Sequence, residues 1–289
     1  RILRFLRFHV QYGQGRPDRD ALAACRRGAD KVQTLARERI AQEFFKILAV
    51  ENPVDVIKIM RENSILARLF HNSFDTDGLR VLCDLQGEIA QIRIPPRLLA
   101  IAGFDSVHYK GLDTILTLPN IYKRTGEKIL EALQKLKEIT SYQYRVFVYR
   151  YDHEIATDAF MLKAATWPTA CDDVVQIISN HADWQAPALP VNGDDVQALG
   201  VKPGPHLGAI LNRVEAWWLA RDFAPNRDEC LEYAGSVVSG ESRVVSFFAI
   251  SRSLSQRNTT HSELTTSPAA AGTSISPPGC RRSEGRSAY

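Results

Sequence analysis

Basic and aromatic side chains alternate at the start of this 289-residue chain. Arg1, Arg4 and Arg7 carry guanidinium groups that can grip phosphates, while Phe8 and Tyr12 carry rings that can meet a nucleic-acid base. At about 100° per residue, the arginines gather on one side of a helix and apolar residues on another. The apolar side consists of Ile2, Leu3, Leu6 and Val10. The cationic side is either a phosphate-binding face or the solvated face of a packing helix.

The pattern Arg-x-Leu-Arg-x-x-Arg-Phe-x-x-x-x-Gly at residues 1–13 resembles the end of a motif in the class II tRNA nucleotidyltransferases. This is the family of CCA-adding enzymes and bacterial poly(A) polymerases. Its motif opens Glu-Asp-Pro-x-Arg, and the Asp and Arg form a protein template that hydrogen-bonds the incoming base. Arg1 stands at the position of that Arg, so the resemblance implies a nucleotide-template role for it. The rest of the motif would precede residue 1, and we therefore expect the sequence to be a fragment.

Residues 38–48 predict a helix with a core-facing stripe at the i, i+4, i+7, i+8 spacing, formed by Ile40, Phe44, Ile47 and Leu48. The segment Glu-Arg-Ile-x-x-Glu-Phe-x-Lys-Ile-Leu is similar to the family's next motif, which has Leu in place of Phe44. In the family this helix braces the templating site. The resemblance thus implies a supporting role for Arg4, Arg7, Glu38, Arg39 and Glu43. The alternative is that Arg39 and Glu43 are surface charges that pair at i, i+4.

Residues 123–139 predict a helix with a lysine-rich outer face. Lys123, Arg124 and Lys128 on this face can follow a phosphate backbone, but an ordinary solvated helix carries the same pattern. Residues 147–165 are similar to the family's body region, where Tyr-Arg-Tyr-Gly precedes a helix of Asp-Ala-x-Leu-Leu type, although Asp152 replaces the Gly. Arg150 lies between two tyrosines, which suits either stacking on RNA or an aromatic corner between two helices.

Residues 189–211 carry the most specific motif of the body region. They predict a short helix that ends before Gly200, a stiff turn, and a long helix that begins near Pro205. The segment resembles the family's C-terminal signature Gly-x-Asp-Leu … Leu-Gly-x-x-Pro-Gly-Pro-x-Gly. Free N–H groups at the start of the second helix would form a phosphate-binding site beside Lys202. The residues concerned are Gly204, His206 and Leu207.

The periodicity is helical almost throughout, so we predict an all-α fold: a multi-helix neck and body array, a C-terminal helical hairpin and a disordered tail. Pro95 and Pro96 interrupt the pattern, and residues 103–119 give only a weak helical signal. The predicted divisions are a neck-like RNA-binding region at 1–70, a body and tail domain at 71–234, and a disordered segment at 235–289 that is rich in Ser, Thr, Gly, Pro and Arg.

Composition adds few constraints on function. The net charge of +3 is compatible with RNA binding without demanding it. The five cysteines are scattered singly, which excludes a zinc ribbon and fits a reduced, cytoplasmic compartment. No apolar run approaches the roughly 18 residues of a membrane span. We therefore expect no membrane partner.

The chemistry of the resembled family is carried by a head domain that precedes the templating motif. A Gly-Gly-x-x-Arg-Asp loop holds the triphosphate there, and an Asp-x-Asp pair binds two Mg²⁺ ions. In this sequence Asp18 with Asp20, and Asp75 with Asp77, have the Asp-x-Asp spacing, but both pairs stand at predicted helix starts, where capping explains them. We expect no catalytic and no metal-binding residue here, and no nucleotide incorporation by the chain alone; Mg²⁺ and ATP or CTP would serve the parent enzyme.

The leading hypothesis is the RNA-binding part of a nucleotidyltransferase that acts on tRNA or other RNA 3′ ends. The motifs are common to CCA-adding and poly(A)-adding relatives, so both reactions stay open. Two alternatives are a free-standing helical RNA-binding module and a helical scaffold that binds protein.

Overall fold

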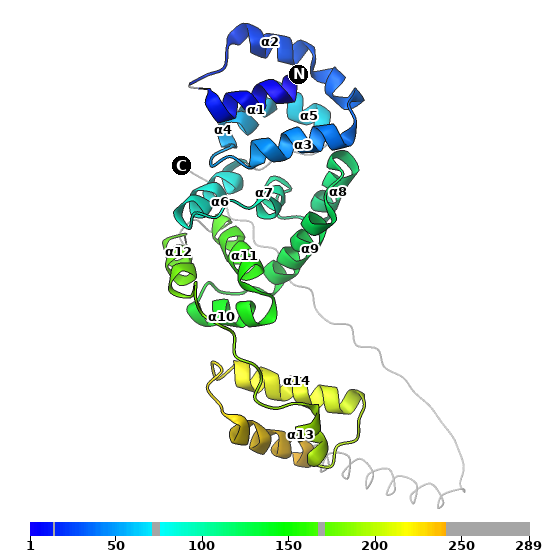
Figure 1. Cartoon of the computed structure of the whole chain (residues 1–289), viewed down its shortest axis with the longest axis vertical. Helices are drawn as coiled ribbons and strands as arrows, with labels where there is room; N and C mark the ends of the chain where they lie inside the picture. The colour runs from blue at the N-terminus through cyan, green and yellow to red at the C-terminus, as the bar shows by residue number, and fades with distance from the viewer. Residues whose placement is uncertain (14, 71–75, 167–170, 241–289) are drawn as a thin grey trace, which may run out of the picture.

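The computed structural model describes residues 1–13, 15–70, 76–166 and 171–240. As predicted, the fold is all-α, and no strand occurs within these ranges. The described helices form an elongated stack of three groups (Figure 1). The first group lies at the N-terminal end of the stack, the second in the middle, and a helical hairpin at the opposite end.

The N-terminal group surrounds an apolar centre that α1 and α3 share. Leu6, Phe44 and Ile47 are fully buried there, and all four residues of the predicted stripe on α3 are buried. The spacing of these side chains matches the 3.6-residue period, which explains why the sequence predicted both helices. The group consists of α1 (Ile2–Tyr12), α2 (Arg19–Arg27), the 3₁₀ helix η1 (Ala29–Thr34), α3 (Arg37–Leu48), α4 (Val54–Glu62) and α5 (Ile65–Leu69).

The middle group is built around α11. This helix is buried on nearly all sides and packs against α6, α9, α10 and α12, so it shows little amphipathic character. Its core is continuous with that of the N-terminal group. The group consists of α6 (Thr76–Glu88), α7 (Ile94–Ile101), α8 (Ser106–Leu116), α9 (Asn120–Lys135), α10 (Ser141–Arg150), α11 (His153–Ala165) and α12 (Cys171–Asn180).

A buried ion pair fixes the start of α7 against α11. The Nε of Arg93 donates to both carboxylate oxygens of Asp158, at 3.1 and 2.8 Å, and its guanidinium also pairs with Glu154 at 2.8 Å. Burial raises the pKa of Asp158 to about 7, although the Arg93 cation opposes that shift. The Asp of the Asp-Ala pattern is therefore a structural anchor in this fold.

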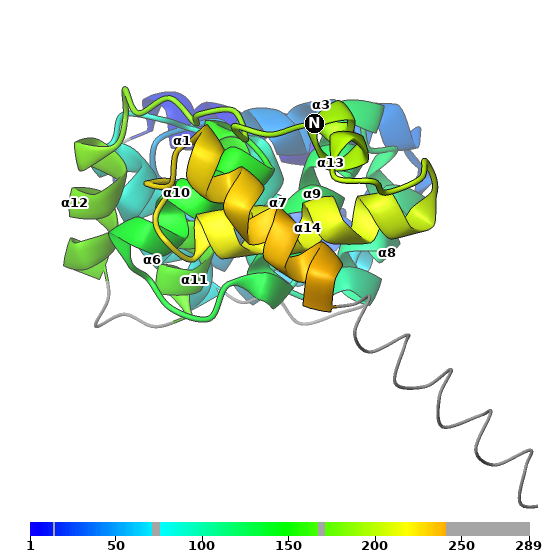
Figure 2. The same ribbon diagram turned by 90° about the horizontal axis from the view of Figure 1, so that it is seen from below.

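The C-terminal hairpin has a separate core. It contains α13 (Gly193–Ala198), α14 (Pro205–Leu219) and a further helix at residues 227–240, which lies across α14 in Figure 2. Trp218 is buried in this core, and Trp217 stacks on Tyr233 at a centroid distance of 4.5 Å. The remaining core residues include Val196, Val201, Ile210, Val214 and Cys230.

Helix α10 connects the hairpin to the middle group. Arg145 donates to Asp222 at 3.0 Å and approaches Nε2 of His181 at 2.9 Å. The Nδ1 of His181 lies 2.8 Å from the carbonyl oxygen of Ile177, so Nδ1 carries the proton and Nε2 accepts from Arg145. One arginine thus joins the end of α12 to the end of α14.

The structure differs from the predicted elements in four places. Helix α8 forms within residues 103–119, and the Pro95–Pro96 pair stands in the first turn of α7, where a missing N–H costs nothing. The short helix η1 follows α2 directly. The last helix continues to residue 240, six residues into the predicted tail, and Val237 is buried against the hairpin. Residues 241–289 lie outside the described part.

Candidate RNA-binding site

The helix that opens the chain forms as predicted, with its apolar side against α3. Leu3 and Leu6 are buried, while Ile2 and Val10 are partly buried against the same core. The helix ends at Gly13, where a Cβ atom would lie 2.5 Å from the carbonyl oxygen of His9. That close approach gives a physical reason for the glycine at the end of the resembled motif.

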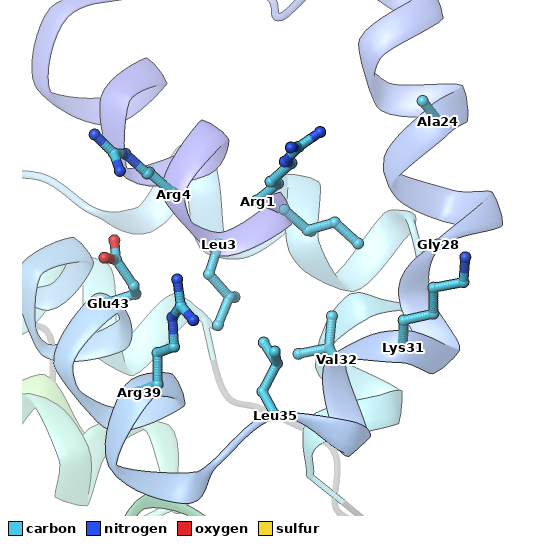
Figure 3. A pocket seen from close by; sticks show the side chains of 11 residues that line it. Arg1, Leu3, Arg4, Ala24, Gly28, Lys31, Val32, Leu35, Arg39 and Glu43 are labelled. Atoms are coloured by element: carbon cyan, nitrogen blue, oxygen red, sulfur yellow. The ribbon is translucent and has the colours of Figure 1, made fainter.

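A cleft of about 480 Å³ opens between α1, the α2–η1 segment and α3 (Figure 3). Its apolar part comes from Leu3, Val32 and Leu35. In Figure 3, Arg39 and Lys31 reach the cleft from opposite sides, with Val32 and Leu35 between them. The full lining is Arg1, Ile2, Leu3, Arg4, Ala24, Gly28, Lys31, Val32, Leu35, Arg39 and Glu43.

The charges around the cleft are predominantly positive. The side chains of Arg1, Arg4, Lys31 and Arg39 form no ion pair within the described ranges, whereas the single acid of the lining, Glu43, is paired with Arg7. Four cations around a small, partly apolar hollow favour an anionic ligand that also has an apolar face. A nucleotide has both properties.

The Arg7–Glu43 ion pair holds α1 on α3. The Nε of Arg7 donates to the Glu43 carboxylate at 2.7 Å, and the two side chains are only 15% and 22% exposed. The alternative interpretation, in which Arg39 pairs with Glu43 along α3, does not describe this structure. Glu43 turns toward α1 because Arg7 offers a shielded, charge-assisted partner, so Arg39 faces the cleft unpaired.

The structure therefore brings together only some of the predicted template residues. Arg1, Arg4, Arg39 and Glu43 line the cleft, whereas Arg7 does not line it and pairs with Glu43. Glu38 is exposed in the first turn of α3 and does not line the cleft. Its role in supporting the template helix stays a prediction.

The sequence interpretation missed Lys31. This residue lies on η1, and Gly28 separates η1 from the preceding helix. In sequence, Lys31 looks like one more surface lysine beyond the end of a helix. Lys31 lies across the cleft from Arg39 because of how η1 packs. No local pattern in the sequence predicts that packing.

The basic residues of α9 lie away from the cleft. Lys123 is bound to Asp113 on α8 at 2.7 Å, and this contact holds the pKa of Asp113 below its usual range. Arg124 and Lys128 are exposed and have no ion-pair partner among the residues that the structure describes. Lys123 thus helps join α8 to α9, and only the other two present free charge.

The two tyrosines beside Arg150 form an aromatic corner. The Tyr149 ring packs edge-on against Trp218 and Phe223, and its hydroxyl donates to Glu215 at 2.8 Å. Burial raises the pKa of Tyr149 to about 12, so the hydroxyl remains a donor. Tyr151 packs on Phe147. Both rings are therefore occupied by protein contacts, and the exposed Arg150 is not flanked by free stacking surfaces.

Asp152 fits the turn before α11 although the resembled pattern has glycine there. Its φ of 173° is an extended conformation that any residue adopts, and its carboxylate accepts from the N–H of Ile155 at 2.7 Å. The aspartate therefore replaces glycine as a helix cap.

Asp18 likewise caps α2, as predicted, by accepting from the N–H of Ala21 at 2.8 Å. Asp75 lies outside the described residues.

The turn of the C-terminal hairpin has the predicted geometry but offers fewer free backbone N–H groups to a phosphate than predicted. Gly200 has a φ of +91° just beyond α13, and Pro205 begins α14. Lys202, Gly204 and His206 are exposed. The N–H of Leu207, however, donates to the carbonyl oxygen of Gly204 at 3.1 Å, and Pro205 has no N–H. The predicted availability of the Leu207 N–H was therefore wrong, because the first turn of α14 uses it.

Comparisons with known proteins show what the chain is similar to. Residues 16–74 match a family model described as the probable RNA and SrmB-binding site of polymerase A. The mitochondrial CCA tRNA nucleotidyltransferase 1 of Mus musculus is 24% identical over 244 residues, covering 81% of this chain and 54% of the relative. The CCA-adding enzyme of Leuconostoc citreum (strain KM20) is 24% identical over 244 residues and shares 83% of this chain and 60% of its own length. The chain is thus similar to CCA-adding enzymes over most of its length, and residues 16–74 are similar to the RNA-binding region of polymerase A.

A solved CCA-adding enzyme in complex with ATP has the same fold over 83% of this chain and 59% of its own, with a TM-score of 0.57 and 16% identity. This chain spans a little over half the length of each of these relatives. The RNA-binding match begins at residue 16, so it includes the α2, η1 and α3 walls of the cleft but not α1. Among the described helices, none is long and apolar enough to cross a membrane.

Proposed function

We propose that this chain holds the 3′ end of an RNA, a tRNA in particular, for a nucleotidyltransferase that adds CCA or a poly(A) run. In this proposal Mg²⁺ and ATP or CTP act at the catalytic head of the parent enzyme. Arg1 hydrogen-bonds the incoming base as part of the template, and the other cations of the cleft bind phosphate oxygens. The apolar residues of the cleft, among them Leu35, contact the base or ribose.

The unneutralised positive cleft is the observation that carries this proposal. Arg4, Lys31 and Arg39 come from three different elements and converge without acidic partners in the described structure. Such convergence costs electrostatic repulsion unless an anion occupies the cleft. Two of the three elements lie inside the region that matches the RNA-binding family model.

Charge reversal on separate surfaces tests where RNA binds. We expect Arg39→Glu to weaken binding of a tRNA lacking its terminal CCA and to reduce the slope of log affinity against log salt by roughly one to two charges. The melting temperature should hardly change, because Arg39 is exposed and unpaired. Filter binding across a salt series with matched thermal melts measures both. Lys202→Glu and Arg124→Glu apply the same change to the hairpin and to α9.

The three variants separate contact surfaces from architecture. If only Lys202→Glu leaves affinity and slope unchanged, the hairpin turn joins two helices and does not bind RNA. If Arg39→Glu binds tRNA like the unaltered chain, the cleft does not hold the RNA. A chain that binds no RNA at low salt would favour the protein-scaffold alternative.

A further inference from the structure

A line of exposed side chains leads from the cleft along the outer side of α1. Arg1, Arg4, Phe8 and Tyr12 follow one another at intervals of three, four and four residues, which keeps them on one side of a helix. They extend over about 16 Å at 1.5 Å per residue. The first two residues line the cleft, and the last two carry exposed rings. These four residues are named the α1 stripe.

The rings of the α1 stripe are solvent-accessible and accompanied by cations. Phe8 is 40% and Tyr12 76% exposed, and their rings stack at a centroid distance of 6.0 Å with an interplanar angle of 30°. The guanidinium carbons of Arg7 and Arg4 lie 4.4 and 5.3 Å from the Phe8 ring centroid. Aromatic faces beside guanidinium groups are the combination that binds single-stranded nucleic acid.

We propose that the α1 stripe is a stacking platform for single-stranded RNA. The nucleotides before the 3′ end lie along α1 with their bases against Phe8 and Tyr12, while Arg4 holds a phosphate at the mouth of the cleft. This inference rests on the proposed function and extends it to the single-stranded segment of the RNA.

The charge of α1 favours RNA over an apolar protein partner. The helix contains no acidic residue. A protein surface that covered the rings would therefore remove Arg4 from water while α1 supplies no carboxylate to pair with its charge. An RNA strand supplies a phosphate for each cation and a base for each ring. Among the described residues, the other large exposed apolar side chains are aliphatic and offer no ring for stacking; they are Ile92, Val107, Ile121 and Leu199.

Truncation of each ring tests the platform. A single-stranded oligonucleotide with 2-aminopurine next to its 3′ end is titrated with the full chain. We expect fluorescence quenching on binding, and a loss of affinity of roughly five- to tenfold in Phe8→Ala and in Tyr12→Ala. The salt slope should stay unchanged because no charge is removed. Tyr12→Phe keeps the ring and should bind normally.

Two controls make the result specific. Ile121→Ala removes a side chain that is 65% exposed on α9 and should leave affinity unchanged. A fully base-paired RNA should bind the ring variants and the unaltered chain equally, since its bases are not available for stacking. Tyr12 is too exposed for its truncation to unfold α1, so it remains informative if Phe8→Ala lowers the melting temperature.

The outcomes distinguish this inference from the proposed function. If both ring variants bind the oligonucleotide within twofold of the unaltered chain while Arg39→Glu binds weakly, the platform is wrong and RNA binding by the cleft stands. If the unaltered chain binds neither RNA at low salt, both proposals fail.

Discussion

Replacement of Arg97 with methionine is expected to destabilise the fold by about 3–5 kcal/mol. Arg97 is completely buried on α7 and donates to Oε1 of Gln86 at 2.6 Å and to the carbonyl oxygens of Leu48 and Glu51 at 2.6 and 2.9 Å. It also donates to the carbonyl oxygen of Val50. The three backbone acceptors, of Leu48, Val50 and Glu51, lie at the end of α3 and just beyond it, where carbonyl groups have no helical partner.

The large effect follows from what the methionine leaves behind. Burial lowers the pKa of Arg97, but an arginine stays protonated in proteins, and the guanidinium donates to neutral oxygens. Methionine fills a similar volume yet satisfies none of these acceptors, so several buried oxygens lose their donors together. The N-terminal group would lose its main polar attachment to the middle group.

Thermal melting or urea titration measures this loss. A decrease of about 3–5 kcal/mol corresponds to a fall in melting temperature of roughly 6–20 °C for a chain of this size. Arg97→Lys keeps the charge with fewer donors. Its free energy of unfolding should lie between those of the unaltered chain and Arg97→Met. Arg124→Met removes an exposed arginine and should change stability by less than about 0.5 kcal/mol. A loss below about 1 kcal/mol for Arg97→Met would show that the hydrogen bonds do not hold the two groups together.

Gly126→Ala is expected to destabilise the protein by about 2–3 kcal/mol, although alanine normally stabilises a helix. A Cβ atom at Gly126 on α9 would lie 2.2 Å from Cζ of Tyr109 and 2.3 Å from its hydroxyl oxygen. The Tyr109 ring is buried, and its hydroxyl donates to the carbonyl oxygen of Tyr122 at 2.6 Å. The ring has no room to move without loss of that bond.

Gly111→Ala is the matched control for this substitution. Gly111 is also helical, on α8, but a Cβ atom there would meet no heavy atom within 4 Å. Alanine at this position should therefore be neutral or stabilise by up to about 1 kcal/mol. Tyr109→Leu should partly rescue Gly126→Ala in a double-mutant cycle of melting experiments. Equal effects at the two glycines would contradict the packing argument.

The sequence predicted those features of the fold that depend on local periodicity. The stripe on α3 and the hairpin turn at Gly200 formed as expected, because apolar spacing and turn glycines act over a few residues. Helix α8 was missed although Tyr109, Leu112 and Leu116 are buried along one side of it. Its polar residues and Gly111 interrupt the pattern, and packing against α3 and α9 compensates for the weak local preference.

The candidate site was only partly predictable for a related reason. Arg1, Arg4 and Arg39 were identified from motifs, but the motifs say nothing about which face each helix turns to its neighbours. Lys31 reaches the cleft through a 3₁₀ turn, and Glu43 pairs with a residue 36 positions away instead of with its helical neighbour. Both outcomes depend on tertiary packing, which the sequence pattern does not encode locally.

The placement of the RNA 3′ end in the N-terminal cleft can be tested directly by cross-linking. A tRNA lacking its terminal CCA, with a single 4-thiouridine at its 3′ end, is bound to the full chain and irradiated, and the attached peptides are identified by mass spectrometry. We expect cross-links to the cleft lining on α1, η1 and α3, and their loss in Arg39→Glu. Cross-links confined to the hairpin near Lys202 or to α9 would contradict it.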